Sequence, residues 1–363
     1  MKFLTNLGLY LHIPFCNGKC AYCDFYSAFT NKELIDSYTI ALIREIKQWG
    51  GKINRPIDTI YLGGGTPSLL NGRLVPLLKA VFDNFTVLDD AEITLELNPT
   101  DNVFEILQNA KTAGVNRISI GAQSGLDHEL LTLGRRHTVK DTEAAVETAR
   151  KLGFDNISLD LMLGLPDSNC ESLQKSLDFL IKLAPEHISA YILKIEENTK
   201  FHKLKDTLNL PDDDAVSDQY LFMCEYLENN GFCHYEISNF CKNNMASRHN
   251  LKYWNCEEYL GIGPSAHSYL SGKRFYYPRD LKAFIKGNLP TPDGDGGDLQ
   301  EQIMLFLRLK NGIKIDTLPT KAIKKCELFA KNGLAVLENG NFALTNNGML
   351  LSNTIISEIL EEF

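Results

Sequence analysis

The sequence predicts an α/β fold, in which an open barrel of six strand–helix units precedes a small C-terminal α+β module. Two observations predict the barrel. Apolar stretches of strand length alternate with longer amphipathic helical patterns over the first 195 or so residues, and several helical patterns end at glycines such as Gly114 and Gly153. A third observation predicts the module, because the Pro/Gly/Asp-rich run 290–297 is typical of a linker.

Each unit of the barrel has its own stretch of sequence. The predicted strands are Gly8–Pro14, Asp58–Leu62, Glu92–Asn98, Asn116–Gln123, Asn156–Leu163 and His187–Leu193. The predicted helices include Lys32–Trp49, Asp101–Ala113, Lys140–Leu152 and Glu171–Leu183. Strands that are spaced by helices form a parallel sheet through right-handed crossovers, and six units close only part of the circle that eight units close.

The alternation within the strands predicts what the two faces of the sheet contact. One face is apolar, whereas the other carries polar groups that include Glu96, Gln123 and Asp160. A closed barrel fills its interior with apolar side chains, and a buried carboxylate without a partner is costly. Because outer helices would cover the apolar face, we expect the polar face to line a hydrated or ligand-filled cavity. The alternative is that the polar face meets bulk solvent.

Composition limits the classes of function. The 363 residues carry a formal net charge of −9 and contain no long basic run, so we expect no nucleic-acid partner. No apolar run approaches the ~20 residues that cross a bilayer, and the first ten residues lack the features of a signal peptide. We therefore expect a cytoplasmic protein whose thiols stay reduced.

The pattern changes after residue 210. A helix is predicted at Ala215–Asn229, and an aromatic-rich segment follows it. The predicted elements of the tail are the helices Leu299–Leu309, Lys321–Asn332 and Met349–Leu360 and the hairpin Leu334–Thr345. We expect three parts: a barrel at 1–210, an extension of the barrel at 211–292, and a winged-helix-like module at 293–363. No basic recognition helix is evident in the module, which favours a docking role.

Three cysteines on one short segment, Cys16, Cys20 and Cys23, carry the strongest chemical signal. A [4Fe–4S] cluster normally takes four thiolates, so a set of three leaves the fourth iron open to a small-molecule ligand. With 9 Cys in 363 residues, this spacing arises by chance less than about once in a thousand for a given cysteine. The alternative is zinc, although structural zinc takes four ligands, usually as two cysteine pairs. We expect the other six cysteines, which show no CxxC pairing, to be reduced thiols, and a second cluster is the alternative.

A run of three glycines, Gly63 to Gly65, follows the second predicted strand. It lacks the Lys-Ser/Thr pair of a phosphate loop and the spacing of a dinucleotide-binding motif. Glycines at the C-terminal end of a strand let the backbone approach a ligand closely. Beside a three-thiolate cluster, the run fits the head group of an amino acid that chelates the open iron.

The cysteine spacing, the glycine run and the six-unit barrel resemble the radical S-adenosylmethionine (SAM) superfamily. Further segments resemble its oxygen-independent coproporphyrinogen III oxidase group, namely residues 10–16 (YLHIPFC), 62–69 (LGGGTPSL), 96–99 (ELNP), 120–124 (IGAQS), 133–137 (LGRRH) and 160–166 (DLMLGLP). The resemblance runs nearly end to end. It implies a partial (β/α)6 radical SAM barrel with a [4Fe–4S] cluster and SAM as cofactors.

The resemblance also implies roles for individual residues. Cys16, Cys20 and Cys23 would hold the cluster. The residues of the SAM pocket would be Tyr10, Tyr22, Asp24, Gly64, Gly65, Thr66, Glu96, Gln123, Arg135 and Asp160. Carboxylates accept hydrogen bonds from ammonium and ribose hydroxyl groups, and a guanidinium pairs with the SAM carboxylate. For each residue alone, a structural hydrogen bond is the alternative.

Within this group the resemblance leaves two functions open. The oxidative decarboxylase of coproporphyrinogen III carries a further cysteine two positions after the third ligand, where Phe25 stands here, and an N-terminal extension that is absent here. Both differences favour the branch of heme chaperones. That branch implies heme as cargo and recipient hemoproteins as partners, with membrane-bound respiratory enzymes among the candidates. A homodimer is compatible with the sequence, which does not set the oligomeric state.

Residues 249–254 (HNLKYW) match the HNxxYW signature of the chaperone branch. An imidazole is a common axial ligand of heme iron, and Tyr and Trp offer flat apolar faces to a porphyrin. The resemblance therefore implies that His249, Asn250, Tyr253 and Trp254 bind heme. The alternative is that His249 caps a loop while the two aromatic residues lie in the core. His267 is a second candidate ligand, for which a structural role is the ordinary expectation.

Overall fold

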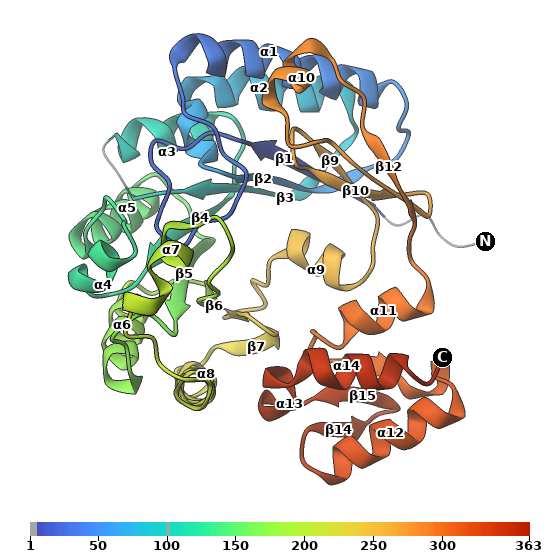
Figure 1. Cartoon of the computed structure of the whole chain (residues 1–363). Helices are drawn as coiled ribbons and strands as arrows, with labels where there is room; N and C mark the ends of the chain where they lie inside the picture. Colours follow the sequence, from blue (N-terminus) through green and yellow to red (C-terminus); the bar gives the residue numbers. More distant parts are fainter. Residues whose placement is uncertain (1–5, 100–101) are drawn as a thin grey trace.

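The structure is a computed structural model that describes residues 6–99 and 102–363. Within these residues one twelve-stranded sheet has the order β12-β11-β10-β9-β1-β2-β3-β4-β5-β6-β8-β7. Its six parallel central strands are β1 (Leu7–Ile13), β2 (Ile57–Gly64), β3 (Val87–Leu97), β4 (Arg117–Gln123), β5 (Ile157–Leu163) and β6 (His187–Ile192). The sheet curves into an open barrel (Figure 1). The predicted fold class is confirmed.

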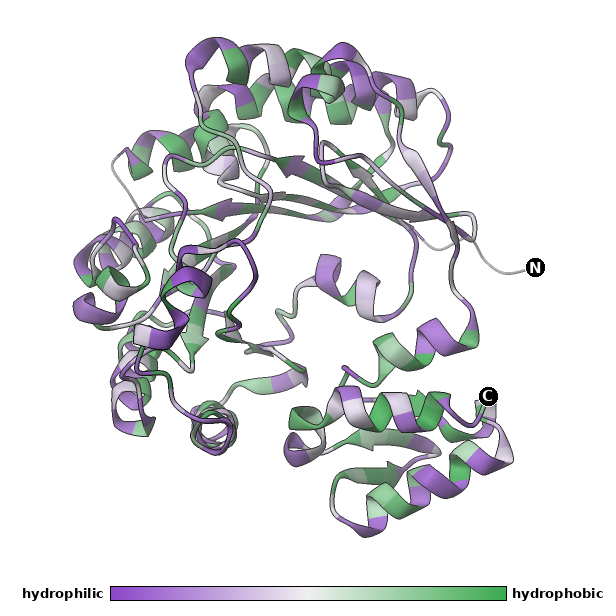
Figure 2. Cartoon of the chain, in the orientation of Figure 1, coloured by the Kyte–Doolittle hydropathy of each residue, from purple (hydrophilic) through white to green (hydrophobic). Residues whose placement is uncertain are grey.

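Helices cover the outer side of this curved sheet (Figure 1). They are α1 (Lys32–Gly50), the 3-10 helix η1 (Pro67–Arg73), α2 (Leu74–Asn84), α3 (Val103–Thr112), α4 (Asp127–Thr132), α5 (Val139–Lys151) and α6 (Cys170–Lys182). Capping sets their starts: the Asn31 side chain accepts from the Leu34 amide, and Thr138 with Asp141 forms a capping box. The predicted start of α3 at Asp101 lies outside the described residues. Figure 2 shows hydrophilic residues on the outward sides of these helices.

Short strands extend the sheet at both ends. One end adds β9 (Tyr259–Ile262), which is parallel to β1, and then the antiparallel β10 (His267–Leu270), β11 (Lys273–Tyr276) and β12 (Thr291–Asp295). The other end adds β8 (Asn239–Cys241) and β7 (Cys233–Glu236). The run 290–297 is therefore not only a linker, because β12 forms inside it. Pro292 is tolerated because an edge strand leaves one row of N–H groups unpaired.

The remaining elements between β6 and the C-terminal module lie around the curved sheet. They are α7 (Lys200–Leu204), the 3-10 helix η2 (Lys205–Thr207), α8 (Asp213–Asn229), α9 (Arg248–Trp254) and α10 (Leu281–Lys286). Helix α9 lies on the inner side of the sheet, between the barrel strands and the C-terminal module (Figure 1). No helix among the described residues is long and apolar enough to cross a membrane.

The C-terminal module contains the predicted helices and hairpin. Its elements are α11 (Leu299–Phe306), β13 (Ile313–Lys314), the 3-10 helix η3 (Ile315–Thr317), α12 (Thr320–Lys331), β14 (Ala335–Glu338), β15 (Asn341–Leu344), α13 (Asn346–Leu350) and α14 (Ser352–Leu360). The hairpin turns at Asn339 and Gly340, which both have positive φ. The single helix predicted at Met349–Leu360 is wrong, because the chain breaks the helix at Leu351. The division of the chain at 210 and 292 stays a prediction.

Candidate functional site

The polar face of the central strands lies on the inner side of the curve, where α9 also lies. Thr94, Ser119 and Ser158 on this face are buried, and the Thr59 hydroxyl is hydrogen-bonded to the His249 ring of α9. The polar face therefore turns toward α9, and the hydrated or ligand-filled cavity expected along it stays a prediction. Following the direction of the parallel strands, we call their C-terminal ends with the loop 14–28 the mouth, and their N-terminal ends with α9 the base.

Two carboxylates lie on this inner face. Glu96 accepts hydrogen bonds from the Tyr61 hydroxyl (3.0 Å) and the Gly64 amide (3.2 Å), and burial together with the nearby Asp160 charge raises the pKa of Glu96 to about 7. Asp160 accepts a hydrogen bond from Ser119 (3.2 Å), and burial raises the pKa of Asp160 to about 6. Neither carboxylate forms an ion pair within the described residues. Both carboxylates can therefore accept hydrogen bonds from a cationic or hydroxyl-bearing ligand.

Arg135 connects the cysteine loop to the strand ends. One terminal nitrogen of its guanidinium donates to the Asn98 side chain (2.7 Å) and the Gly121 carbonyl (2.8 Å), while the other lies 3.5 Å from the Cys20 sulfur. The Asn98 amide in turn donates to the Thr66 hydroxyl (3.0 Å). A fixed positive charge thus stands between the thiols and the glycine run, where it can pair with a carboxylate.

The loop 14–28 brings the three cysteines of the spacing motif together. It is closed by the Ala28 amide, which donates to the Pro14 carbonyl (2.7 Å). All three thiols are free and half-buried. Burial raises the pKa of Cys23, and the neighbouring Cys20 and Cys16 raise it further. The three thiols therefore lie close enough to interact electrostatically. Within the described ranges, no three His, Cys, Asp or Glu side chains are arranged around a single metal ion.

The glycine run is needed for close packing at the mouth. A Cβ atom on Gly65 would lie 2.5 Å from the Phe15 carbonyl oxygen of the cysteine loop, and Gly64 has a φ of +116° beside the His12 ring. A side chain at either position would push the loop away from the end of β2. The three thiols, the glycine backbone and the unpaired carboxylates together suit a three-thiolate cluster that carries an amino-acid ligand.

The structure brings together most, but not all, of the predicted SAM-pocket residues. Tyr10 lies on the inner face, with its hydroxyl 3.0 Å from the His12 ring, and Tyr22 lies against Arg135. Gln123 is buried at the end of β4 with a φ of 68°. Asp24 is the exception, because it is exposed on the cysteine loop and no hydrogen bond joins it to the others among the described residues.

Sequence analysis missed Arg117, which is only 2% exposed on the inner face of β4. Its Nε is buried without a hydrogen-bond partner in the described structure. Its charge lowers the pKa of both Glu96 and Asp160. The signal was present, since Arg117 precedes Ser119 by two residues and so shares the polar face.

The HNxxYW segment forms α9 at the base. His249 is fully buried, and its two ring nitrogens are hydrogen-bonded to the Thr59 and Tyr253 hydroxyls, each at 2.8 Å. Its ring stacks on Tyr61 (5.3 Å between centroids), and burial lowers the pKa of His249 to about 3. The Glu92 carboxylate accepts from the His249 amide (3.1 Å) and so caps the helix. In this conformation no ring nitrogen of His249 is free for heme iron.

The other predicted heme residues do not surround one common space. Trp254 faces the Arg308 guanidinium, 5.8 Å from the ring centroid, at the junction with the C-terminal module. The Asn250 amide donates to the Ser247 hydroxyl at the start of α9. His267 is exposed and stacks on Tyr276 across β10 and β11. Heme binding by His249, Asn250, Tyr253 and Trp254 stays a prediction.

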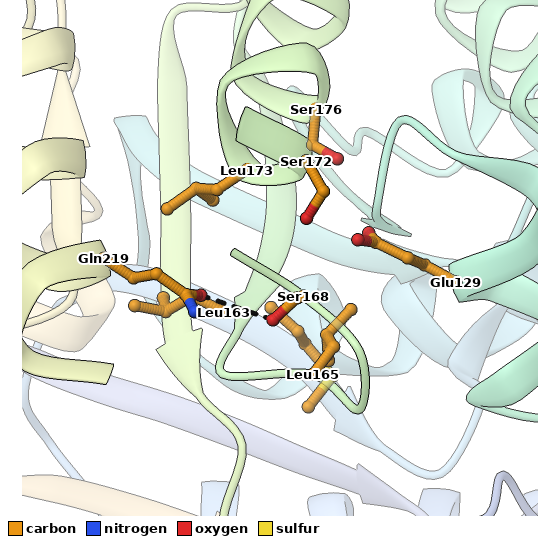
Figure 3. A pocket seen from close by; sticks show the side chains of 9 residues that line it. Glu129, Leu163, Leu165, Ser168, Ser172, Leu173, Ser176 and Gln219 are labelled. Atoms are coloured by element: carbon orange, nitrogen blue, oxygen red, sulfur yellow. Dashed lines mark hydrogen bonds between the residues drawn. The ribbon is translucent and has the colours of Figure 1, made fainter. Parts of the chain in front are cut away.

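A small hollow lies between β5, α6 and α8 (Figure 3). The Gln219 side chain accepts from the Gly164 amide (3.0 Å) and the Ser168 hydroxyl (3.4 Å), and Ser124 bonds to both Glu129 and Ser176. The hollow is too small for a water molecule. It is a packing feature rather than a ligand site.

Comparison with known proteins supports one family. Residues 10–180 match the model of the radical SAM superfamily. The heme chaperone HemW of Mycobacterium tuberculosis is 34% identical over 97% of this chain and 94% of its own length, and HemW of Bacillus subtilis is 36% identical over 97% and 99%. The solved coproporphyrinogen III oxidase (HemN) of Escherichia coli shares the fold, with a TM-score of 0.84 at 22% identity over 98% of this chain and 90% of that chain. The chain therefore belongs to the HemW family of radical SAM proteins.

Proposed function

We propose that this protein is a heme chaperone, which binds heme and transfers it to recipient hemoproteins, and that its barrel holds a [4Fe–4S] cluster and SAM. The observation that carries the proposal is the match to proteins named heme chaperone over 97% of the chain. A second observation supports it: Phe25, 65% exposed on the cysteine loop, stands where the resemblance to the decarboxylase implies a further cysteine.

Cys16, Cys20 and Cys23 would hold the cluster, which when bound supplies an open iron and electrons for SAM. The chain's own groups suit the rest of SAM. Arg135 would pair with its carboxylate. The ionised Glu96 and Asp160 would accept hydrogen bonds from its ammonium and ribose hydroxyl groups.

The remaining members of the proposed SAM pocket border these groups. Gly64 and Gly65 leave room for close backbone approach, and Thr66 is tied to Asn98. Tyr10, Tyr22 and Gln123 would add contacts from the inner face, and Asp24 would reach the ligand only if the cysteine loop brought it inward. In the proposed function SAM and the cluster govern heme loading or release.

The structure sets a condition for heme ligation by His249. One ring nitrogen can reach heme iron only after its hydrogen bond, to Thr59 or to Tyr253, is broken and the buried ring becomes accessible through a movement of α9. Because the Tyr253 hydroxyl is hydrogen-bonded to the His249 ring, breaking that bond would also free the Tyr253 hydroxyl. We therefore propose that heme binding by this segment is coupled to opening of the base.

Titration of heme into the purified, cluster-reconstituted protein tests the function. A saturable Soret change with about one heme per chain is expected, followed by transfer to an apo-hemoprotein. The absence of saturable binding to the wild-type protein would overturn the chaperone proposal. The His249→Ala variant then tests the ligand, with His128→Ala, which alters an exposed histidine of α4, as the control. Equal affinities and identical Soret spectra for wild type and His249→Ala would remove His249 from the heme site.

Oxidative decarboxylation of coproporphyrinogen III is the second candidate function. The observation that favours it is the shared fold with the solved HemN enzyme. An anaerobic assay with reductant and SAM distinguishes the two functions. Vinyl products at the rate of a genuine decarboxylase would replace the chaperone proposal, and their absence under the same conditions would end the alternative.

A further inference from the structure

Two cysteines outside the cluster loop are direct partners across the last pair of strands in the large sheet. Strands β7 and β8 are antiparallel, and their register pairs Cys233 with Cys241 and His234 with Phe240. The His234 and Phe240 rings stack with centroids 4.2 Å apart, which agrees with that register. Because successive side chains alternate between faces, Cys233 and Cys241 project together from the opposite face.

The register alone places the two cysteines within disulfide reach. Residues that are directly opposite in an antiparallel pair have Cα atoms about 4.5 or 5.5 Å apart, depending on their hydrogen bonding. Disulfides join cysteines whose Cα atoms are about 4.4–6.8 Å apart. Both thiols are free, and neither belongs to the cluster motif.

The two thiols differ in access. Cys233 is exposed on the edge strand, whereas Cys241 is 4% exposed on the inner strand. Burial raises the pKa of Cys241 to about 11, Cys233 raises it further, and Arg117 opposes the shift. A small oxidant therefore meets Cys233 first, and Cys241 is held beside it as the resolving thiol.

We propose that Cys233 and Cys241 form a redox modification site, which a low-molecular-weight disulfide such as oxidised glutathione converts into an intramolecular disulfide. In the first step the Cys233 thiolate attacks one sulfur of glutathione disulfide, forms a mixed disulfide and releases one glutathione thiolate. In the second step the Cys241 thiolate, after losing its proton to solvent, attacks the Cys233 sulfur and releases the second glutathione. Two protein thiols are thus oxidised, and one disulfide is reduced to two thiols.

The site lies where the barrel meets the C-terminal module. The Ile237 amide, just after β7, donates to the Arg308 carbonyl (2.9 Å), and the Lys310 amide donates to the Tyr235 carbonyl (3.1 Å). A bond from β7 to β8 would fix the strand that carries this junction. We expect slower hydrogen exchange at the Ile237 and Lys310 amides in the oxidised protein.

Peptide mass spectrometry of the full-length, cluster-loaded protein tests the proposal. After anaerobic treatment with oxidised glutathione, free thiols are alkylated and the protein is cut with trypsin. Residues 206–242 form one peptide that contains Cys224, Cys233 and Cys241 and ends at its only lysine. We expect this peptide to change from three alkyl groups to one, with a further loss of about 2 Da for the disulfide. Dithiothreitol should restore three alkyl groups.

Variants locate the bond. Cys233→Ser and Cys241→Ser should each abolish the intramolecular disulfide, whereas Cys256→Ser, a half-buried cysteine elsewhere, should leave it unchanged. A wild-type peptide that keeps three alkyl groups, or that carries glutathione on Cys233 without resolving, would overturn the proposal. A disulfide that uses Cys224 instead would also overturn it. None of these outcomes depends on whether the protein binds heme.

Discussion

The mouth and the base of the barrel both place charged and polar side chains inside the same curved sheet, but they satisfy them differently. At the base, Lys252 pairs with Asp58 (2.9 Å) and Glu257 (3.1 Å), and the His249 ring is bonded at both nitrogens. At the mouth, Glu96 and Asp160 form no ion pair within the described structure. Buried groups that are paired within the chain are already satisfied, so removing one partner is costly, whereas buried groups that lack a counter-charge are available to a ligand.

This difference in pairing distinguishes a ligand site from a structural cluster, which a match to a motif alone does not do. The HNxxYW residues and the SAM-pocket residues both match family motifs and both lie on the inner side of the sheet. Only the second group combines unpaired carboxylates, a cation and close backbone approach at the C-terminal ends of the strands, where ligands bind in folds of this kind. The HNxxYW residues are instead satisfied by contacts within the chain, as structural residues are, for as long as α9 stays at the base.

The largest expected effect is at the mouth. Cys20→Ala removes one of the three proposed ligands, so reconstituted protein should fall from about four irons per chain to nearly none and lose the cluster absorbance. Cys256→Ala, which alters a cysteine far from the loop, should keep the full iron content. Iron and sulfide analysis of material prepared without oxygen measures both. Unchanged iron in Cys20→Ala would remove the cluster from this loop.

The next effect tests the base. Lys252→Met leaves the partly buried Asp58 and Glu257 without their shared, buried cation, and breaking such a pair costs up to about 3 kcal/mol. The matched control is Lys182→Met, whose exposed pair with Glu143 is worth under about 1 kcal/mol. Denaturant unfolding gives both values. If Lys252→Met were no more destabilising than the control, the base would not be the stabilising region.

How much of this could be predicted from the sequence depends on how local each signal is. The cysteine spacing and the strand–helix alternation are contained in short stretches, so the cluster loop and the central strands were predictable. The hydrogen bonding of His249 was not predictable, because it depends on Thr59, 190 positions earlier in the chain, and on the Glu92 carboxylate that caps α9. The partnership of Cys233 with Cys241 depends on strands of only three and four residues, which carry too little periodicity to predict.

A smaller effect separates binding from stability at the mouth. Glu96→Gln should weaken SAM binding about 10- to 100-fold, since it removes one charge-assisted contact. The same change should stabilise the ligand-free protein by about 1–3 kcal/mol above pH 7. The sign follows from the raised pKa: folding raises the pKa of Glu96 from 4.5 to about 7, so its ionisation costs stability above pH 7 and costs none below 4.5.

For Glu96→Gln, calorimetric titration with SAM measures the binding affinity and denaturant unfolding measures the stability, both at pH 8. The expected combination is weaker binding with higher stability, which is the opposite of Lys252→Met, where stability falls and SAM binding is retained. Weaker binding together with lower stability would mean that Glu96 is a structural residue like those of the base.

The smallest effect concerns Arg117, which breaks the simple contrast, because it lies at the base end of β4 and its Nε is nevertheless unpaired. Its charge lowers the pKa of Glu96 and Asp160, so Arg117→Met should raise both pKa values.

SAM affinity in the wild type should decline below about pH 7 as Glu96 takes up a proton. In Arg117→Met this decline should begin up to about one pH unit higher, which weakens binding at pH 7 by at most about tenfold. Arg117→Lys keeps the charge and should restore the wild-type midpoint. If Arg117→Met lowered affinity equally at every pH, Arg117 would act through packing, and the contrast between mouth and base would need no electrostatic link between them.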